Sequence, residues 1–341
     1  MRVAVYYRNE DVRLEEMSKP TIGAGEFLVK VMACGICGSD VLEWYRVKRA
    51  PLVLGHEATG EIVEVGEGTG PYRVGHRVFV SHHVPCGECR YCLQDHQTAC
   101  ETLHETNYYP GGFAEYLRVP EINVKHGVYL LPKDLSFEAG TFIEPLGCVV
   151  RAQRLAQIRE NHTVLILGSG ISGLLHLRLS RLRGSDLVVT TDVNEYRMNA
   201  AKTFGATAVV HGREDVSERL RELNDGRLAD RVIVCTGALS ASKQALQCVD
   251  RGGTVVFFAV PEPSVELPVT VGRLWRDEIT LMTSYGAGPK DLQEALELIG
   301  SRRISVRDLI THRLSLAEAG HGFKLVSEAS KSLKVIVEPQ R

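Results

Sequence analysis

Four cysteines with short spacing are the residues whose chemistry is easiest to name. Cys86, Cys89, Cys92 and Cys100 follow the pattern C-x2-C-x2-C-x7-C. Thiolates two residues apart can reach one ion from a single turn, and the longer step closes a tetrahedron from across a loop. Four thiolates leave no open coordination position, so the pattern predicts a structural zinc site, with an iron–sulfur cluster as the alternative. Nearby histidines are interpreted as ordinary loop residues: His82, His83 and His96.

A second chemical pattern is the glycine-rich turn in TVLILGSGISG, residues 163–173. Gly168, Gly170 and Gly173 form G-x-G-x-x-G after an apolar run and at the start of a helical stretch, which is the context this motif requires. Gly168 permits a tight turn, and Gly170 lets the backbone approach a pyrophosphate at the positive end of the helix. Gly173 lets helix and strand pack closely. The turn predicts dinucleotide binding, with a merely tight strand-to-helix turn as the alternative.

Asp192 ends the next strand-like run and predicts the type of dinucleotide. An acidic side chain there accepts hydrogen bonds from the adenosine ribose and repels a 2′-phosphate, which favours NAD over NADP. Val193 and Asn194 follow, so no basic residue is adjacent, and Arg197 lies one helical turn further on. Asp192 as the N-cap of the following helix is an alternative, and the two roles are compatible.

The elements that hold these motifs change in character near residue 150. Before it, strand-like runs at 27–33, 59–66 and 76–82 are punctuated by glycine. After it, strand-like runs alternate with helical stretches, which predicts a doubly wound parallel sheet in an α/β unit. The expected strands are 163–167, 186–191, 207–211, 231–235, 254–259 and 278–283.

Beyond about residue 285 the alternation stops. An amphipathic helix at 290–300, a capping box from Ser315 to Glu318 and a strand at 333–338 are expected. We predict a β-rich domain of residues 1–150 and 286–341, which contains the cysteine lobe at 86–100, and a nucleotide-binding domain of residues 151–285. A length of 341 residues agrees with two domains at about 150 residues each.

Composition excludes several partners. Lys and Arg number 40 against 42 Asp and Glu, so the net charge of −2 gives no reason to bind nucleic acid or an anionic membrane. No apolar run approaches the roughly 18 residues of a membrane span, and no secretory signal is recognisable, so a cytoplasmic location is expected. Thiols stay reduced there, and nine cysteines, an odd number, suit disulfide pairing poorly.

Three further fragments carry metal-ligand residues: ACGICGSD (33–40), LGHEATG (54–60) and FIEPLGC (142–148). With the cysteine lobe, the glycine turn and GGFAEY (111–116), they make the chain resemble the zinc-dependent medium-chain alcohol and polyol dehydrogenases, including the sorbitol- and threonine-dehydrogenase-like members. The resemblance covers nearly the whole chain. It implies a GroES-like catalytic domain and a Rossmann NAD-binding domain.

The resemblance assigns ligands of a catalytic zinc. Cys37 and His56 match the two constant ligands, and Glu144 stands at the third position, where polyol and threonine dehydrogenases often carry glutamate. Glu57 matches a glutamate that binds the metal directly or through water. Two alternatives remain open. Glu144 is also placed as an acid at a helix N-terminus, and Cys148 is a rival ligand.

The resemblance also assigns residues that do not bind the metal. Ser39 matches the hydroxyl that passes the substrate proton, and Asp40 matches a carboxylate that orients the histidine ligand. Leu42 stands where family members often carry a histidine that ends the proton relay. Ile171 stands in the cofactor-binding turn where proline is frequent, and Arg197 completes a D-x4-R pattern of the cofactor site.

Three protein ligands leave one position open, and zinc there is a Lewis acid that activates an alcohol oxygen for hydride transfer to NAD. The resemblance therefore implies a zinc- and NAD-dependent oxidoreductase, with about two zinc ions per chain, that interconverts a secondary alcohol and a ketone. A sorbitol or other polyol dehydrogenase is the leading interpretation. L-threonine 3-dehydrogenase and a cyclic polyol or aminocyclitol dehydrogenase are the alternatives.

A non-catalytic NAD-binding sensor is the interpretation from a different class, and it would be expected to lack Cys37, His56 or Ser39. The resemblance further suggests a homodimer or homotetramer joined through the nucleotide-binding domains. The remaining cysteines are interpreted as packed apolar residues: Cys34, Cys235 and Cys248. A basic run is either solvated or a binding site for a phosphorylated or carboxylated substrate: Arg46, Lys48 and Arg49.

Overall fold

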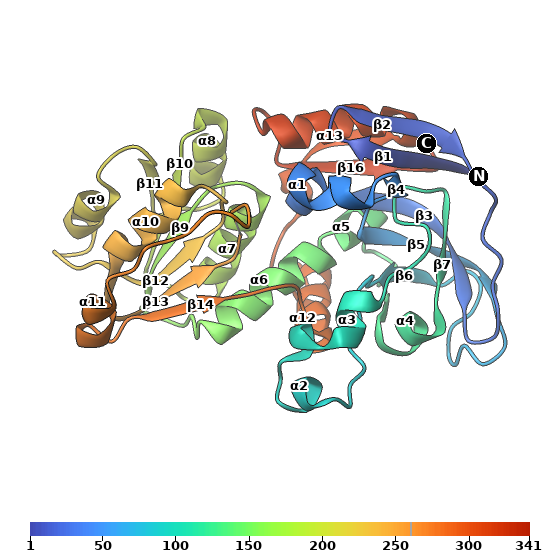
Figure 1. Ribbon diagram of the computed structural model, residues 1–341, viewed down its shortest axis with the longest axis horizontal. Helices are drawn as coiled ribbons and strands as arrows, with labels where there is room; N and C mark the ends of the chain where they lie inside the picture. Colours follow the sequence, from blue (N-terminus) through green and yellow to red (C-terminus); the bar gives the residue numbers. More distant parts are fainter. Residues whose placement is uncertain (260) are drawn as a thin grey trace. The chain divides into compact units, whose positions relative to one another are not determined.

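The computed structural model describes residues 1–259 and 261–341 and divides into two compact units (Figure 1). The first unit comprises Met1–Gly147 and Ala287–Arg341, and the second comprises Cys148–Gly286. The first unit is rich in β-sheet, and the second is built on a parallel sheet. The predicted fold class is therefore confirmed.

The first unit contains two sheets. Its strands are β1 (Arg2–Arg8), β2 (Asp11–Glu16), β3 (Phe27–Gly35), β4 (Leu52–Val53), β5 (Glu57–Val65), β6 (Arg77–Val80), β7 (Tyr116–Val119), β8 (Val128–Leu130), β15 (Ile310–Ser315) and β16 (Lys334–Glu338). The larger sheet has the order β15-β16-β3-β5-β6-β8, with β7 also paired to β3, and the smaller has the order β2-β1-β4. The late strand β16 pairs antiparallel with β3 through Ile336 and Gly35, so distant parts of the chain share one sheet.

Short helices connect these strands. They are η1 (Gly38–Val41), α1 (Glu43–Arg46), η2 (Val47–Arg49), α2 (Arg90–Leu93), η3 (Gln97–Ala99), α3 (Glu101–Glu105), α4 (Glu121–His126), α5 (Phe137–Gly140), α12 (Pro289–Gly300), η4 (Arg307–Leu309), η5 (Leu316–Glu318) and α13 (Ala319–Glu328). The predicted capping box is present at η5, where the Ser315 N–H donates to Glu318 Oε2 over 2.8 Å.

Aromatic side chains form the centre of the first unit's core. Phe323 of α13 packs against Tyr6 and Phe113, with ring centroids 5.5 and 5.6 Å away respectively, and all three side chains are buried. Buried aromatic pairs of this kind add to the free energy gained from removing apolar area from water. They hold the two sheets and α13 together around β3 and β5, the strands that carry the site described below.

The second unit is a six-stranded parallel sheet. Its strands are β9 (Thr163–Leu167), β10 (Leu187–Asp192), β11 (Ala208–His211), β12 (Ala229–Val234), β13 (Val249–Phe257) and β14 (Thr280–Thr283). The order β11-β10-β9-β12-β13-β14 reverses at β9, and because parallel crossovers are right-handed, the connections on the two sides of β9 run over opposite faces. The strands expected from the sequence are thus confirmed, with ends displaced by a few residues.

Helices connect these strands, and the central strand is accordingly buried. They are α7 (Ile171–Leu182), α8 (Glu195–Thr203), α9 (Val216–Leu223), α10 (Leu239–Cys248) and α11 (Val271–Arg276), preceded by α6 (Ile143–Leu155), which begins in the first unit. All residues of β9 are buried, as a strand covered on both faces requires. Among the described residues, no helix combines the length and hydropathy needed to cross a membrane.

Candidate functional site

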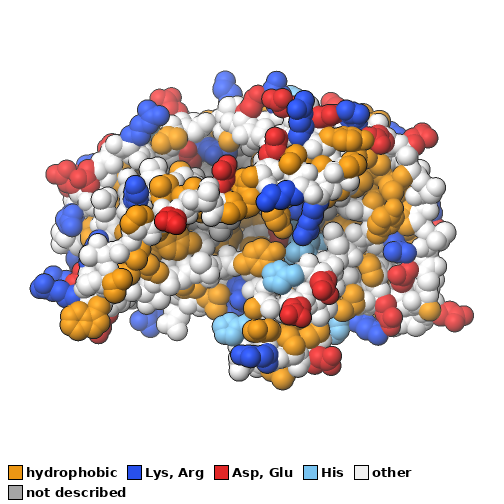
Figure 2. All heavy atoms as spheres, in the orientation of Figure 1, with side chains coloured by type: hydrophobic (Ala, Val, Ile, Leu, Met, Phe, Trp, Pro, Cys, Tyr) orange, Lys and Arg blue, Asp and Glu red, His pale blue; other side chains and the backbone are white. Residues whose placement is uncertain are grey.

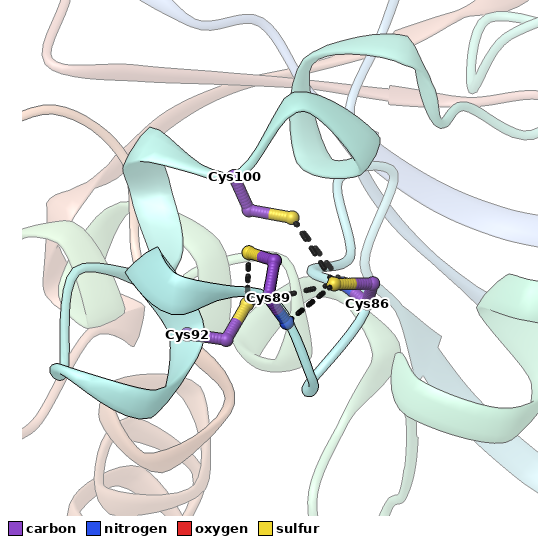
Figure 3. Close-up of side chains that lie close together, drawn as sticks. All are labelled: Cys86, Cys89, Cys92 and Cys100. Atoms are coloured by element: carbon purple, nitrogen blue, oxygen red, sulfur yellow. Dashed lines mark hydrogen bonds between the residues drawn. The ribbon is translucent and has the colours of Figure 1, made fainter.

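The four clustered cysteines converge on one point in the first unit (Figure 3). Cys89 Sγ lies 3.5 Å from Cys92 Sγ, Cys100 Sγ lies 3.6 Å from Cys86 Sγ, and Cys86 Sγ lies 3.9 Å from Cys92 Sγ. Thiolates about 2.3 Å from a tetrahedral zinc ion lie about 3.8 Å from one another. These separations fit zinc and are far longer than the roughly 2.05 Å of a disulfide bond.

Hydrogen bonds from backbone N–H groups lower the pKa values of two of these thiols. Hydrogen bonds from the N–H groups of Glu88 and Cys89 lower the pKa of Cys86. Burial raises the pKa of Cys100, but the N–H groups of Cys86 and Leu103, together with the side chains of Thr102 and Cys86, outweigh burial and lower that pKa to about 6. Because the thiolate is the metal-binding form, the backbone of this lobe favours metal binding.

Replacing Cys89 by alanine is expected to empty the four-cysteine site. Three remaining thiolates bind zinc more weakly, so zinc content should fall from about two ions per chain to about one. The loss of the metal cross-link should also lower the midpoint of thermal unfolding. Atomic emission spectrometry on the purified protein measures the zinc content, with Cys235→Ala as the matched control. An absorption band typical of iron–sulfur clusters would contradict the zinc assignment.

A second group of possible metal ligands lies at the ends of two paired strands. Ligand atoms of Cys37, His56 and Glu57 all lie within 4.8 Å of one another. Cys37 follows β3, and Glu57 begins β5 directly after His56. Residues Gly35 and Glu57 are opposite each other in the β3–β5 ladder, so the sheet register brings the two fragments together.

Asp40 links the backbone of Cys37 to the ring of His56. Its Oδ2 accepts from the Cys37 N–H over 3.0 Å, and its Oδ1 lies 3.2 Å from His56 Nδ1. Burial raises the pKa of Asp40, but His56, Arg46 and the Cys37 N–H outweigh it and lower the pKa overall. An ionised Asp40 fixes the imidazole with Nδ1 carrying the proton, which leaves Nε2 as the ligand atom.

Lys334 is a member of this site that the sequence reasoning missed. Its ammonium group, at the start of β16, pairs with Glu57 Oε2, and both side chains are fully buried. Burial lowers the pKa of Lys334, but Glu57 and Cys37 raise it, and the net pKa is above its ordinary value. A Cβ at Gly35 would lie 1.9 Å from Glu57 Oε2, so this pair requires glycine there. A lysine inside the apolar run LKVIVE was the signal available in the sequence.

Glu144 is not among the clustered ligand atoms. It lies in the first turn of α6, where the helix dipole stabilises its negative charge. Its carboxylate is still close enough to raise the pKa values of Lys334 and Tyr108. The role of Glu144 as the third ligand stays a prediction.

The donor set fits a zinc ion. A thiolate, an imidazole and a carboxylate are the usual zinc ligands. Glu57 Oε1 is buried without a hydrogen-bond partner in the described part of the chain, and a cation would satisfy it. The residues that would hold the ion are therefore Cys37 and His56, with Glu57 and Glu144 as the carboxylates available nearby.

Two further side chains, Arg46 and His82, lie next to the group of possible metal ligands. The Arg46 side chain, 17% exposed, donates from Nε to the Ser39 carbonyl over 3.0 Å and from a terminal nitrogen to Ser39 Oγ over 3.1 Å. The His82 ring centroid lies 4.9 Å from that of His56, and burial holds the pKa of His82 well below its usual value. His82 Nδ1 is buried without a hydrogen-bond partner among the described residues, so this histidine borders the site and is not an ordinary loop residue.

The glycine-rich turn of the second unit has the geometry that close backbone approach requires. Gly168 follows β9 with a φ of +102°, a conformation that favours glycine. A Cβ at Gly173 would lie 1.9 Å from the Gly168 carbonyl oxygen, so only glycine allows this turn. The turn is followed at once by Ile171, the first residue of α7, whose free N–H groups form an anion-binding end.

Asp192 connects the end of β10 to the glycine turn. Its Oδ2 accepts from the Ser169 N–H over 2.8 Å, and its Oδ1 accepts from the N–H groups of Val193 and Asn194. Asn194, not Asp192, is the N-cap of α8, so the alternative role of Asp192 as this N-cap is wrong. Arg197 lies beside Gly170, and its Nε is buried without a hydrogen-bond partner in the described residues. These polar groups and the open glycine turn fit a dinucleotide.

Comparison with known proteins places this chain among related enzymes. Residues 23–132 match the alcohol dehydrogenase GroES-like domain, and residues 172–301 match the zinc-binding dehydrogenase family. Sorbitol dehydrogenase of Bacillus subtilis (strain 168) is 30% identical, and the alignment covers 100% of this chain and 98% of that protein.

Solved structures are similar over almost the whole chain. A zinc-binding dehydrogenase from Sinorhizobium meliloti 1021 bound to NADP has a TM-score of 0.88 and 29% identity, with 99% of each chain covered. Galactitol-1-phosphate dehydrogenase from Escherichia coli has a TM-score of 0.86 and 27% identity, with 99% of this chain and 100% of that chain covered.

The two units, and the two cysteine-containing sites of the first, define a zinc-binding dehydrogenase. The chain belongs to the zinc-dependent medium-chain alcohol and polyol dehydrogenase family, and it is an oxidoreductase acting on CH–OH groups.

Proposed function

We propose that this chain is an NAD-dependent dehydrogenase that interconverts a secondary alcohol of a polyol or sugar-like substrate with the corresponding ketone. The observation that carries the proposal is the convergence of Cys37, His56 and Glu57 on one point, with Ser39 two residues after Cys37 in η1. The identity of about 30% with a sorbitol dehydrogenase supports a polyol over ethanol. Threonine and cyclic polyols or aminocyclitols remain the alternative substrates.

Each residue of the site has a chemical task. Oxidation removes a hydride from the carbinol carbon and a proton from its hydroxyl group. When bound, zinc would supply Lewis acidity and the nicotinamide would accept the hydride. Ser39 Oγ accepts a hydrogen bond from the substrate hydroxyl and, as that proton is taken up, passes its own proton to water or the cofactor ribose, while Asp40 holds the His56 ring and Lys334 holds the Glu57 carboxylate. Arg46 cannot take that proton onward because a guanidinium has no acceptor atom, and Leu42 has no polar atom.

A substrate panel tests the proposal. The zinc-loaded protein is mixed with NAD and with polyols, threonine or cyclic polyols, and NADH absorbance is followed. We expect turnover with at least one acyclic polyol at a kcat/KM above that for threonine. A non-catalytic NAD-binding sensor would bind NAD but form no NADH with any compound.

The cofactor preference is expected to follow Asp192. A carboxylate beside the ribose repels a 2′-phosphate, so kcat/KM with NAD should exceed that with NADP by at least about 10-fold. Asp192→Asn keeps an acceptor oxygen but removes the charge, and it should reduce the preference by about 10-fold because Arg197 can then pair with the phosphate. Glu195→Gln, at an exposed position nearby, is the matched control. Equal efficiency of the wild-type protein with both cofactors would contradict the prediction.

We further propose a homo-oligomer joined through the second unit and a cytoplasmic location. The sheet ends at β14, and α11, which precedes β14 in the chain, exposes Val271 and Trp275, the latter 82% exposed. An exposed apolar patch next to a sheet edge favours association with a second copy. Static light scattering measures the mass in solution. None of the nine cysteines forms a disulfide in the described residues, which agrees with a reducing compartment.

A further inference from the structure

We propose that Arg46 selects substrates that carry an anionic oxygen group, a carboxylate or a phosphate, close to the carbinol carbon. This inference rests on the proposed function, since it assumes that the alcohol is oxidised beside Ser39. It narrows the substrate class from neutral polyols to sugar acids or sugar phosphates. Threonine lies outside this class, because the ammonium group next to its carboxylate would meet the Arg46 cation.

The position of Arg46 supports this role. Its Nε and one terminal nitrogen are held by the carbonyl and the Oγ of Ser39, at 3.0 and 3.1 Å. Its carbon Cζ lies 4.7 Å from the centre of the Tyr45 ring, so the planar group is fixed from two sides. The other terminal nitrogen has no hydrogen-bond partner among the described residues. A guanidinium that is held in this way presents its remaining donors at little cost in conformational entropy.

The positive charge of Arg46 is only partly neutralised by the carboxylate of Asp40. Asp40 Oδ1 lies 3.5 Å from Arg46, but the same oxygen lies 3.2 Å from His56, and the other oxygen accepts from the Cys37 N–H. One carboxylate therefore serves three neighbours. Lys48 and Arg49 follow in η2 and are exposed, and with Arg46 they outnumber Glu43, the acidic residue of the same helix as Arg46. Figure 2 shows Lys and Arg side chains over this region, next to histidine side chains.

Chemistry identifies the group that this arrangement accepts. A guanidinium binds carboxylate and phosphate oxygens through short charge-assisted hydrogen bonds, whereas a neutral hydroxyl gains less from it. Leu42, one helical turn before Arg46, offers no hydrogen bond to a neutral polyol. The basic residues between Arg46 and Arg49 therefore have different roles. Arg46 faces Ser39 as a specificity residue, and Lys48 and Arg49 are solvated.

The first test compares matched substrates. Zinc-loaded wild-type protein, Arg46→Gln and Lys48→Gln are assayed with NAD and with xylitol, xylonate and xylitol phosphate. We expect wild type to favour one of the two anionic compounds over xylitol by about 10- to 100-fold in kcat/KM. Arg46→Gln should abolish that preference, Arg46→Lys should restore part of it, and Lys48→Gln should change it by less than about 3-fold.

The second test measures binding without turnover. The chain has two tryptophans, and Trp44 precedes Arg46 by two residues, so Trp275→Phe leaves a single reporter near the site. The same three compounds are titrated into this protein and its Arg46→Gln version in the presence of NADH. The anionic compound that is preferred should change Trp44 fluorescence with a Kd that rises about 10- to 100-fold when Arg46 is replaced. The two anionic arms decide between carboxylate and phosphate.

The outcomes separate this inference from the proposed function. Turnover of xylitol with no advantage for either anion, or equal losses in Arg46→Gln and Lys48→Gln, would overturn the role of Arg46 and leave the dehydrogenase assignment intact. Arg46-dependent fluorescence changes without NADH formation from any compound would support the anion site and contradict the proposed function.

Discussion

Replacing Cys37 or His56 by alanine is expected to lower kcat/KM by at least about 1,000-fold, the loss of several kcal/mol of transition-state stabilisation. Zinc content should fall from about two ions per chain to about one, because the four-cysteine site is separate from this one. Affinity for NAD should change little, since the glycine turn lies in the other unit. Steady-state kinetics, metal analysis and NADH fluorescence measure the three quantities.

Two further variants test which residue is the third zinc ligand. Glu144→Gln tests the third ligand and should also reduce kcat and zinc content. Cys148→Ala tests the rival ligand, and its activity should stay within a few-fold of wild type. Full kcat in Cys37→Ala would show that the group around His56 does not hold a catalytic metal.

Replacing Lys334 by methionine is expected to lower the free energy of unfolding by about 3–5 kcal/mol, because Glu57 Oε2 would remain buried without its ammonium partner. Methionine keeps a similar length and removes only the charge and its hydrogen bonds. Because both side chains are fully buried in the first unit, solvent screens their interaction little, and the full loss of stability is expected. Urea unfolding measures the effect as a shift of the midpoint at constant slope.

A double variant isolates the cause. Glu57→Gln combined with Lys334→Met removes both charges, so it should be less destabilised than Lys334→Met alone. Lys324→Met, an exposed lysine of α13 paired with Glu328, is the surface control and should shift stability by less than about 1 kcal/mol. If the two lysine variants lost equal stability, the buried pair would not be the reason.

Much of the fold followed from local patterns. The alternation of strands and helices after residue 150 predicted the parallel sheet, because a strand covered on both faces must be continuously apolar, as β9 is. The capping box at Ser315 and Glu318 was readable for a similar reason, since both partners lie within four residues. The strand ends were less certain, because hydrogen bonding in the sheet, not residue type, decides where pairing stops.

The sequence by itself determined the donor atoms and the compact motifs of this protein. The four cysteines and the three glycines act within a single loop or turn, so their spacing alone carries the geometry. Only the tertiary structure decided which distant side chains complete the site. Lys334 meets Glu57 because β16 pairs with β3 and β3 pairs with β5. Arg46 meets Ser39 locally, because only Leu42 separates η1 from α1 and the two residues are seven positions apart. The contact between Lys334 and Glu57 depends instead on strand register and chain direction, which packing of the whole unit selects and no short motif encodes.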